Sequence, residues 1–470
     1  MRRANGNDAM SDITVVTPVG CVGNRGVDPK ALAIAMDEYC PHALAMDAGS
    51  MDCGPWYLGA GKEHSPSINI DHDLEVVIRA GLQAKIPVII GSAGGSGGRR
   101  HVDLTIRRIK RIAAMHSWRF RLAVVYSDVP NNYLVERAGG RETVPGTQSL
   151  ADGSLLRTEE VAASASIVAM MGVEPIIDAL ETGADVVLCG RASDAAVIAA
   201  YPVWKGCDPG LSYHMGDIME CGESAAEEIR PTLRGLTHNR IPIVGTIGKD
   251  SFVLRPALDS LACTPDSCLM HSFYERSDFR LARFPGGTLD RTKALYEAID
   301  ENSTRISGAQ FRREPYSLLL EGVKRVGFRS LFIFGVRTPR MIEQLDQILS
   351  DVEAIEQRLF GESGDLRIHW HQFGKNAVLQ GAEIQSGAAE VGVIADVVAS
   401  TQELAHDVAY DLLTRISFWR YPGRTTTAGN TAMTFSPAVF DGGEVFELSV
   451  YHAMEIDDYR AACRQEILEI

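Results

Sequence analysis

Short apolar runs alternate with amphipathic stretches over the first two-thirds of the chain. The apolar runs predict strands at residues 13–17, 43–46, 86–90, 122–126, 185–188 and 241–246. Between them, apolar residues recur at helical spacing, as in residues 101–116 and 175–181. Strands that alternate with helices are typical of an α/β domain. We therefore predict a doubly wound, mostly parallel sheet for this part of the chain.

The pattern changes after about residue 325, which indicates a second domain. Its runs predict strands at 329–336, 366–373, 390–398, 433–440 and 445–451, and helices at 339–360 and 401–419. The order β-α-β-β-α-β is typical of a ferredoxin-like sandwich. We therefore predict an α/β domain over residues 1–325, which carries the glycine-rich strand-end loops, and a C-terminal ferredoxin-like α+β domain over residues 326–470.

Composition and charge narrow the class of protein. The chain has 470 residues, of which 45% are hydrophobic, and this suits two or three globular domains. A formal net charge of -15 argues against nucleic acid as a partner. No apolar stretch reaches the roughly 18 residues that a membrane helix needs. The nine cysteines are scattered without a Cys-x-x-Cys pair, so we expect reduced thiols and a cytoplasmic protein.

A polar, glycine-containing loop follows the strand-like run 43–46. It reads Asp47-Ala48-Gly49-Ser50-Met51-Asp52-Cys53-Gly54-Pro55. In open α/β sheets, ligands bind at the carboxyl ends of the strands. Asp47 and Asp52 could share a proton, act as acid and base, or bind a metal, with Ser50 beside them. The alternative is a simple turn, because Asp, Gly, Ser and Pro all favour turns.

A second glycine-rich loop follows the run 86–90 and spans residues 91–98. Backbone amides in such a loop can approach an anion closely, and the next helix begins with a cation. The predicted anion-binding residues are Gly91, Ser92, Gly94, Gly95, Ser96 and Arg99. The loop matches neither the P-loop nor the dinucleotide motif. We find no nucleotide or flavin fingerprint, so the sequence names no cofactor and leaves any metal requirement open.

Two further groups of residues are candidates for chemistry. Arg191 and Asp194 follow the strand-like run 185–188. Arg191 could clamp a carboxylate, with Asp194 as its orienter or as a base, or the two could form an internal ion pair. His214, Asp217 and Glu220 are spaced by three, so they face one way on a helix and could bind a metal or serve acid–base chemistry. The alternative is a helix-surface His–Asp pair.

Several co-linear blocks resemble one known family, the AtuA-like proteins, named for acyclic terpene utilisation. The blocks are Asp47-Ala48-Gly49-Ser50, Gly54-Pro55, Tyr57-Leu58-Gly59, Ile90-Gly91-Ser92-Ala93-Gly94-Gly95, Gly183-Ala184-Asp185-Val186-Val187, Gly190-Arg191 with Asp194, Glu220-Cys221-Gly222, Leu320-Glu321-Gly322-Val323, Val326-Gly327, Tyr421-Pro422-Gly423-Arg424 and Thr427-Ala428-Gly429-Asn430. One departure is that many members carry a Gly-His pair where this chain has Gly216-Asp217.

The resemblance implies an N-terminal α/β domain and a C-terminal module that agrees with the ferredoxin-like prediction. It also implies a small partner subunit, which is often encoded beside the shorter members of the family. Members act in catabolic pathways for branched acyl-CoA thioesters and organic acids, so the resemblance implies a small anionic substrate of this kind.

These observations favour an enzyme of the lyase class, of the hydratase or dehydratase type, that acts on a small carboxylic acid or an acyl-CoA thioester. Asp47 or Asp52 would be the general base, and Ser50 would orient it or donate a hydrogen bond to the substrate. Arg191 and the amides of residues 91–98 would hold the carboxylate or enolate oxygen. His214 or Glu220 would be the acid. The alternative is a non-catalytic ligand-binding or assembly subunit. We expect a homo-oligomer that contacts neither nucleic acid nor membrane.

Overall fold

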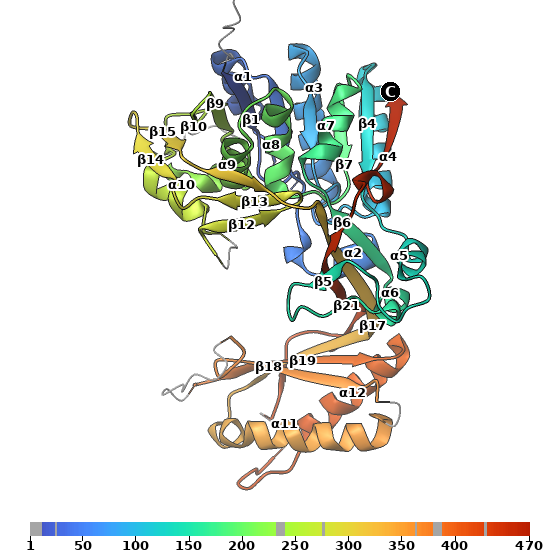
Figure 1. Cartoon of the computed structure of the whole chain (residues 1–470). Helices are drawn as coiled ribbons and strands as arrows, with labels where there is room; N and C mark the ends of the chain where they lie inside the picture. The colour runs from blue at the N-terminus through green and yellow to red at the C-terminus, as the bar shows by residue number, and fades with distance from the viewer. Residues whose placement is uncertain are drawn as a thin grey trace, which may run out of the picture. The chain divides into compact units, whose positions relative to one another are not determined.

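The chain divides by its contacts into two compact units. The computed structural model describes residues 12–23, 26–231, 240–274, 278–361, 364–378, 388–426 and 430–470. One unit comprises residues 1–324 with 448–470, and the other comprises residues 325–447 (Figure 1). The last segment groups with the first unit because its strand β22 (Arg464–Glu469) pairs with β4 (Arg121–Tyr126). The predicted domain boundary after residue 325 stays a prediction.

The first unit is built on a ten-stranded mixed sheet. Its order is β14-β15-β10-β9-β1-β2-β3-β7-β4-β22. The central strands β1 (Ile13–Thr17), β2 (Ala43–Met46), β3 (Val88–Ile90), β7 (Val186–Cys189) and β4 are parallel. The flanking strands β9 (Ile243–Ile247), β10 (Ser251–Pro256), β15 (Thr304–Ser307), β14 (Leu295–Ala298) and β22 are antiparallel to their neighbours.

The prediction of an α/β fold is therefore confirmed. The sheet is mixed, because only its five central strands are parallel. A parallel neighbour needs a crossover of a dozen residues or more, whereas a short turn returns the chain antiparallel. The turn from β9 to β10 is of this short kind. The doubly wound arrangement itself stays a prediction.

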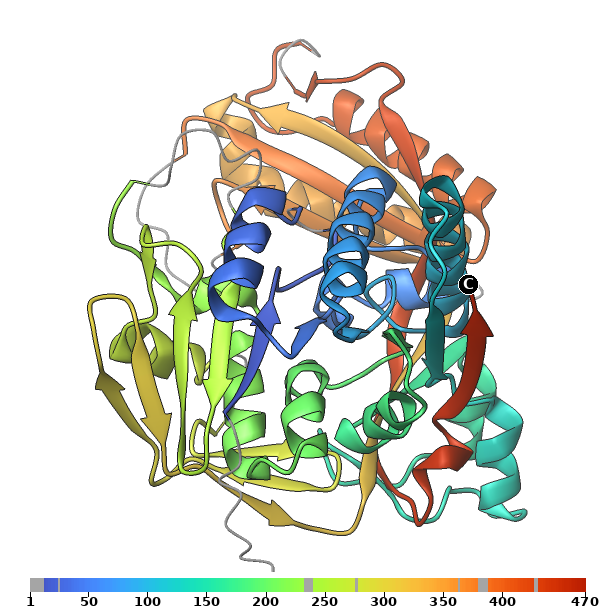
Figure 2. The same cartoon turned by 90° about the horizontal axis from the view of Figure 1, so that it is seen from above.

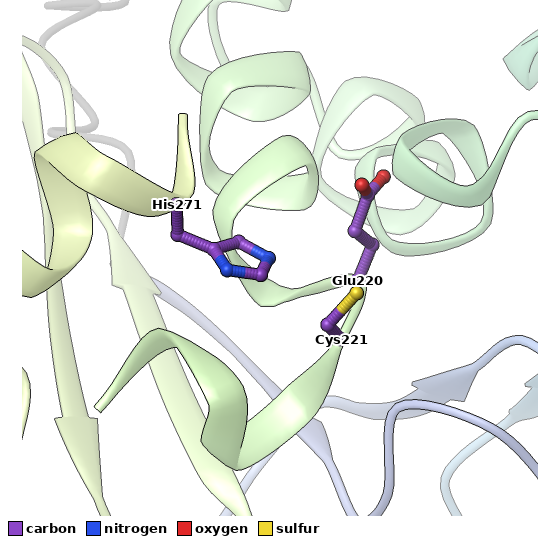
Figure 3. A group of neighbouring side chains, drawn as sticks. All are labelled: Glu220, Cys221 and His271. Atoms are coloured by element: carbon purple, nitrogen blue, oxygen red, sulfur yellow. The ribbon is translucent and has the colours of Figure 1, made fainter. Parts of the chain in front are cut away.

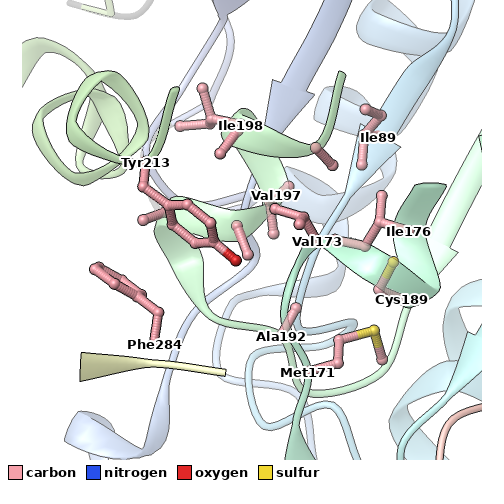
Figure 4. Close-up of a cluster of buried hydrophobic side chains, with 14 of the residues drawn as sticks. Ile89, Met171, Val173, Ile176, Cys189, Ala192, Val197, Ile198, Tyr213 and Phe284 are labelled. Atoms are coloured by element: carbon pink, nitrogen blue, oxygen red, sulfur yellow. The ribbon is translucent and has the colours of Figure 1, made fainter. Parts of the chain in front are cut away.

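Helices cover both faces of the central sheet. Alternate residues of β2 point to opposite faces, so that Leu44 and Met46 pack with α3 (Ser67–Ala84) and α4 (Arg99–His116). Ala43 and Ala45 pack with α7 (Val173–Glu181) and α8 (Asp194–Trp204). Figure 2 shows the blue helices α1 and α3 on one face and the green helices α7 and α8 on the other. Figure 4 shows part of the hydrophobic cluster that contains Ala43 and Ala45, in which Val197 of α8 lies near Ile89 of β3.

The first unit contains further helices and strands besides those of the ten-stranded sheet and its covering helices. Its other helices are α1 (Pro29–Tyr39), α2 (Trp56–Ala60), α5 (Asn131–Ala138), α6 (Thr158–Ala163), α9 (Pro209–Met219) and α10 (Pro265–His271). Its other strands are β5 (Thr147–Ser149), β6 (Ser166–Met170), β8 (Glu227–Glu228), β11 (Leu261–Ala262), β12 (Leu281–Phe284), β13 (Gly287–Asp290) and β16 (Gln310–Arg313). Strands β17 (Ser317–Val336) and β21 (Val439–Glu455) contribute residues to both units.

The second unit has the element order that the sequence pattern predicts. After β17 come α11 (Pro339–Phe360), β18 (Arg367–Phe373), β19 (Val391–Ala399), α12 (Gln402–Phe418), β20 (Ala432–Met433) and β21. The strand order is β18-β19-β17-β21. Apolar residues of α11 and α12, such as Leu345 and Leu412, form one core cluster with the sheet. A ferredoxin-like class for this unit stays a prediction.

Candidate functional site

The loops that follow β2, β3 and β7 meet at one edge of the sheet. These strands are parallel neighbours, so their carboxyl ends lie side by side. Backbone hydrogen bonds join the loops: Gly91 N donates to Met46 O at 3.0 Å, and Ser92 N donates to Gly190 O at 3.0 Å. The residues predicted on three separate loops are therefore brought together at a single place.

Asp47 is a deeply buried carboxyl group at this place. Only 4% of the residue is exposed, and its Oδ2 accepts a hydrogen bond from Gly49 N at 3.2 Å. Burial raises the pKa of the Asp47 carboxyl well above its usual range. The nearby charge of Asp194 raises this pKa further, although Arg191 opposes it. Asp47 and Asp194 are therefore neighbouring carboxyl groups, and Asp47 is the one whose protonated form the site favours.

Arg191 lies beside this pair and is itself 4% exposed. Its Nη1 donates to Asp194 Oδ1 at 3.1 Å and to Ser92 Oγ at 3.2 Å. Its Nε donates to Glu321 Oε2 at 2.8 Å. Burial lowers the pKa of Arg191, but the charges of Glu321 and Asp194 outweigh burial and raise it. The guanidinium is therefore a fixed positive charge within a group of carboxylates.

Glu321 was missed as a functional residue by reasoning from the sequence. It lies on β17, which pairs antiparallel with β6, and Val168 is the residue of β6 opposite Glu321. Its side chain is only 6% exposed. The available signal was a single carboxylate inside the apolar stretch Leu318–Val323, because a charge is rarely buried in such a run without a partner.

Ser50 and Asp52 form a local turn at the exposed side of the same loop. Ser50 caps the short 3-10 helix Met51–Cys53, and its Oγ accepts from Asp52 N at 3.3 Å. Asp52 is exposed, whereas Asp47 is buried. The turn interpretation therefore accounts for Ser50 and Asp52 in this structure, and their catalytic roles stay predictions.

The second glycine-rich loop packs against a histidine that the sequence analysis did not select. His64 Nε2 lies 3.0 Å from Ser96 Oγ, and the imidazole ring packs on Tyr57 at 4.4 Å between centroids. A Cβ on Gly95 would lie 2.3 Å from His64, so the ring needs glycine at this position. Burial, followed by the charges of His101 and Arg191, lowers the pKa of His64 to about 4.

The other members of the predicted anion site have different surroundings. A Cβ added to Gly91 would lie 2.2 Å from Asp47 Oδ1, and a Cβ added to Gly94 would lie 3.0 Å from His101 Cβ. Arg99 is exposed, and its guanidinium lies 4.1 Å from the centre of the Tyr126 ring, near Asp103. This position favours a surface role for Arg99, and anion binding by the loop stays a prediction.

His214 and Asp217 lie in the interior of the first unit, not on the surface of a helix. His214 is fully buried, and its Nε2 lies 3.0 Å from Tyr296 Oη and 3.4 Å from Ser272 Oγ. Burial, followed by the charge of Arg291, lowers the pKa of His214 to about 3. Asp217, at the place where many family members have histidine, forms a buried ion pair with Arg291. Interpreting them as a surface pair was therefore wrong.

Gly91→Ala tests how tightly the carboxyl pair is packed. The added Cβ would lie 2.2 Å from Asp47 Oδ1 and 2.4 Å from Val197 Cγ2. Since Asp47 is buried and cannot move freely, we expect the free energy of unfolding to fall by about 1–3 kcal/mol in chemical denaturation. Gly392→Ala is the control, because its nearest neighbour would lie 3.9 Å away. Equal stability of both variants would contradict tight packing at Asp47.

The fold and the site together define an α/β protein with a buried carboxyl group, Asp47, and a buried guanidinium, Arg191, at its strand ends. The family model described as acyclic terpene utilisation family protein AtuA matches residues 66–446, and the chain belongs to this family. The resemblance is thereby confirmed, although residues 427–429 of one of its blocks lie outside the described residues. No curated protein and no solved structure matches the chain significantly. Among the described residues, no helix is long and apolar enough to cross a membrane.

Proposed function

We propose that this protein is an enzyme that binds a small carboxylate or an acyl thioester and transfers a proton at the strand-end site. The observation that carries the proposal is the buried Asp47 carboxyl beside the partly exposed Asp194 and the buried Arg191. Strongly shifted acids that lie next to a fixed charge are typical of catalytic sites. The reaction class that suits this set of groups is a lyase of the hydratase or dehydratase type.

Each group has a separate role in this proposal. Burial raises the pKa of Asp47, whereas 27% of the Asp194 side chain is exposed, so we assign proton exchange with a ligand to Asp194. Among the described residues, the hydrogen bonds of Arg191 use Nε and Nη1. Its Nη2 is therefore the nitrogen that would hold the carboxylate or the developing enolate oxygen.

Membership of the acyclic terpene utilisation family supports the class of substrate. Degradation of an acyclic terpene skeleton gives branched apolar chains that end in a carboxyl group or a thioester. Addition or removal of water on such a chain needs a base at the α-carbon and a positive charge near the carbonyl oxygen. Asp47 with Asp194, and Arg191, are the groups we assign to these two tasks.

Thermal shifts and proton exchange test the proposal. We expect one compound from a panel of organic acids and acyl-CoA thioesters to raise the Tm of the wild type. In D2O, the α-proton of that compound should exchange, as followed by NMR. Asp194→Asn should slow the exchange by about 10²–10⁴-fold, because a proton-transferring group typically contributes this much. Asp37→Asn, at an exposed position of α1, is the control.

The outcomes separate the two functions. Exchange that is as fast in Asp194→Asn as in the wild type would contradict a proton-transfer role for Asp194. Binding of a compound without exchange or turnover would favour a non-catalytic ligand-binding subunit instead. The thermal shift reports binding alone, so it separates a failure to bind from a failure of the chemistry.

A further inference from the structure

A second group of reactive side chains lies at the end of α9. Glu220 and Cys221 follow α9 directly, and His271 is the last residue of α10. One carboxylate oxygen, the thiol sulfur and one imidazole nitrogen all lie within 4.8 Å of one another. Figure 3 shows the three side chains gathered from the two elements.

The backbone around this group is held in place by local contacts. Gly222 follows Cys221 with a φ of +59°, and a Cβ there would lie 2.7 Å from Gly20 N, so the chain can turn in this way only with glycine. Ser267 of α10 donates from its Oγ to Ala225 O at 2.9 Å. This bond ties α10, and with it His271, to the segment that follows Cys221.

The donor set is that of a transition metal. Thiolate, imidazole and carboxylate are the three ligand types of protein zinc sites. Three protein ligands with a fourth open position are typical of zinc that binds a further molecule. With the metal–ligand distances usual for zinc, tetrahedral donors stand roughly 3.5 Å apart. Rotations of these side chains that move the donor atoms by about 1 Å would therefore bring the three donors to the spacing that a zinc ion needs.

Cys221 also lines a pocket of about 150 Å³. Other residues around this pocket include Cys21, Glu223 and Arg240. An ion bound to Cys221 would thus lie next to a space where water or a small ligand can enter. We propose that Glu220, Cys221 and His271 form a zinc-binding site with an open coordination position. This proposal does not depend on the proton-transfer function.

Cobalt and zinc titrations of the purified chain test this site. After dialysis against a chelator, we expect the wild type to take up one equivalent of Zn²⁺. With Co²⁺ we expect one thiolate-to-cobalt charge-transfer band in the near ultraviolet. Cys221→Ser should abolish this band, and His271→Gln should weaken Zn²⁺ binding at least about 100-fold, because a direct ligand is lost. Cys40→Ser, at an exposed cysteine, is the control. It should keep both the thiolate-to-cobalt band and the affinity for Zn²⁺.

The wild type alone can overturn the proposal. The absence of a thiolate-to-cobalt band at saturating Co²⁺ would exclude Cys221 as a ligand, whatever the variants do. Equal Zn²⁺ uptake by Cys221→Ser, His271→Gln and the wild type would place the metal elsewhere. Circular dichroism of each variant shows whether it is folded, so a misfolded variant is not counted as a loss of metal binding.

Discussion

Arg191→Met is expected to lower the free energy of unfolding by about 3–5 kcal/mol. Methionine has a similar length but no charge, so the substitution leaves Glu321 and Asp194 near the buried Asp47 without a cation. A buried carboxylate that loses its partner costs about this much. Because acid protonates the unpaired carboxylates, the loss should shrink as the pH falls. Urea denaturation at several pH values measures both effects.

A surface arginine provides the matched control for this substitution. Arg157 pairs with Glu159 and Glu160, and about half of its side chain is exposed. Arg157→Met is therefore expected to cost no more than about 1 kcal/mol. If Arg191→Met were equally mild, the guanidinium would not be the charge that holds the strand-end carboxylates together.

The strand-end site could be located from the sequence because its signal is local. A continuous apolar run such as Val88–Ile90 predicts a buried parallel strand, and Gly91 marks where it ends. Since parallel strands end at the same edge, the convergence of Asp47, Ser92 and Arg191 followed from the fold class alone. The antiparallel flanks could not be predicted in this way, because each short strand there can pair in either direction.

The charge balance of the site could not be predicted, because it depends on residues distant in sequence. Glu321 lies 130 positions after Arg191 and reaches it only through the pairing of β17 with β6. His64 meets Ser96 through a turn between two helices. Spacing also could not decide whether His214 is exposed or buried, since a three-residue period gives a common face but not what that face packs against.

His214 is expected to make the protein less stable in acid. Its pKa is lowered to about 3 in the folded chain by burial, whereas an unfolded histidine has its usual value of 6.5. The unfolded state therefore binds more protons between these two values, and stability falls as the pH falls through this range. Between pH 7 and pH 4 the loss from this one residue amounts to about 3 kcal/mol.

Comparison with His214→Gln isolates this effect. Asp47 contributes with the opposite sign, because a raised carboxyl pKa favours the folded state in acid, so the wild type alone would mix the two. Glutamine can still bond to Tyr296 but does not titrate. The wild type should therefore lose about 3 kcal/mol more than the variant from pH 7 to pH 4 in denaturant unfolding. Parallel pH profiles of the wild type and His214→Gln would show that the buried imidazole is not what weakens the fold in acid.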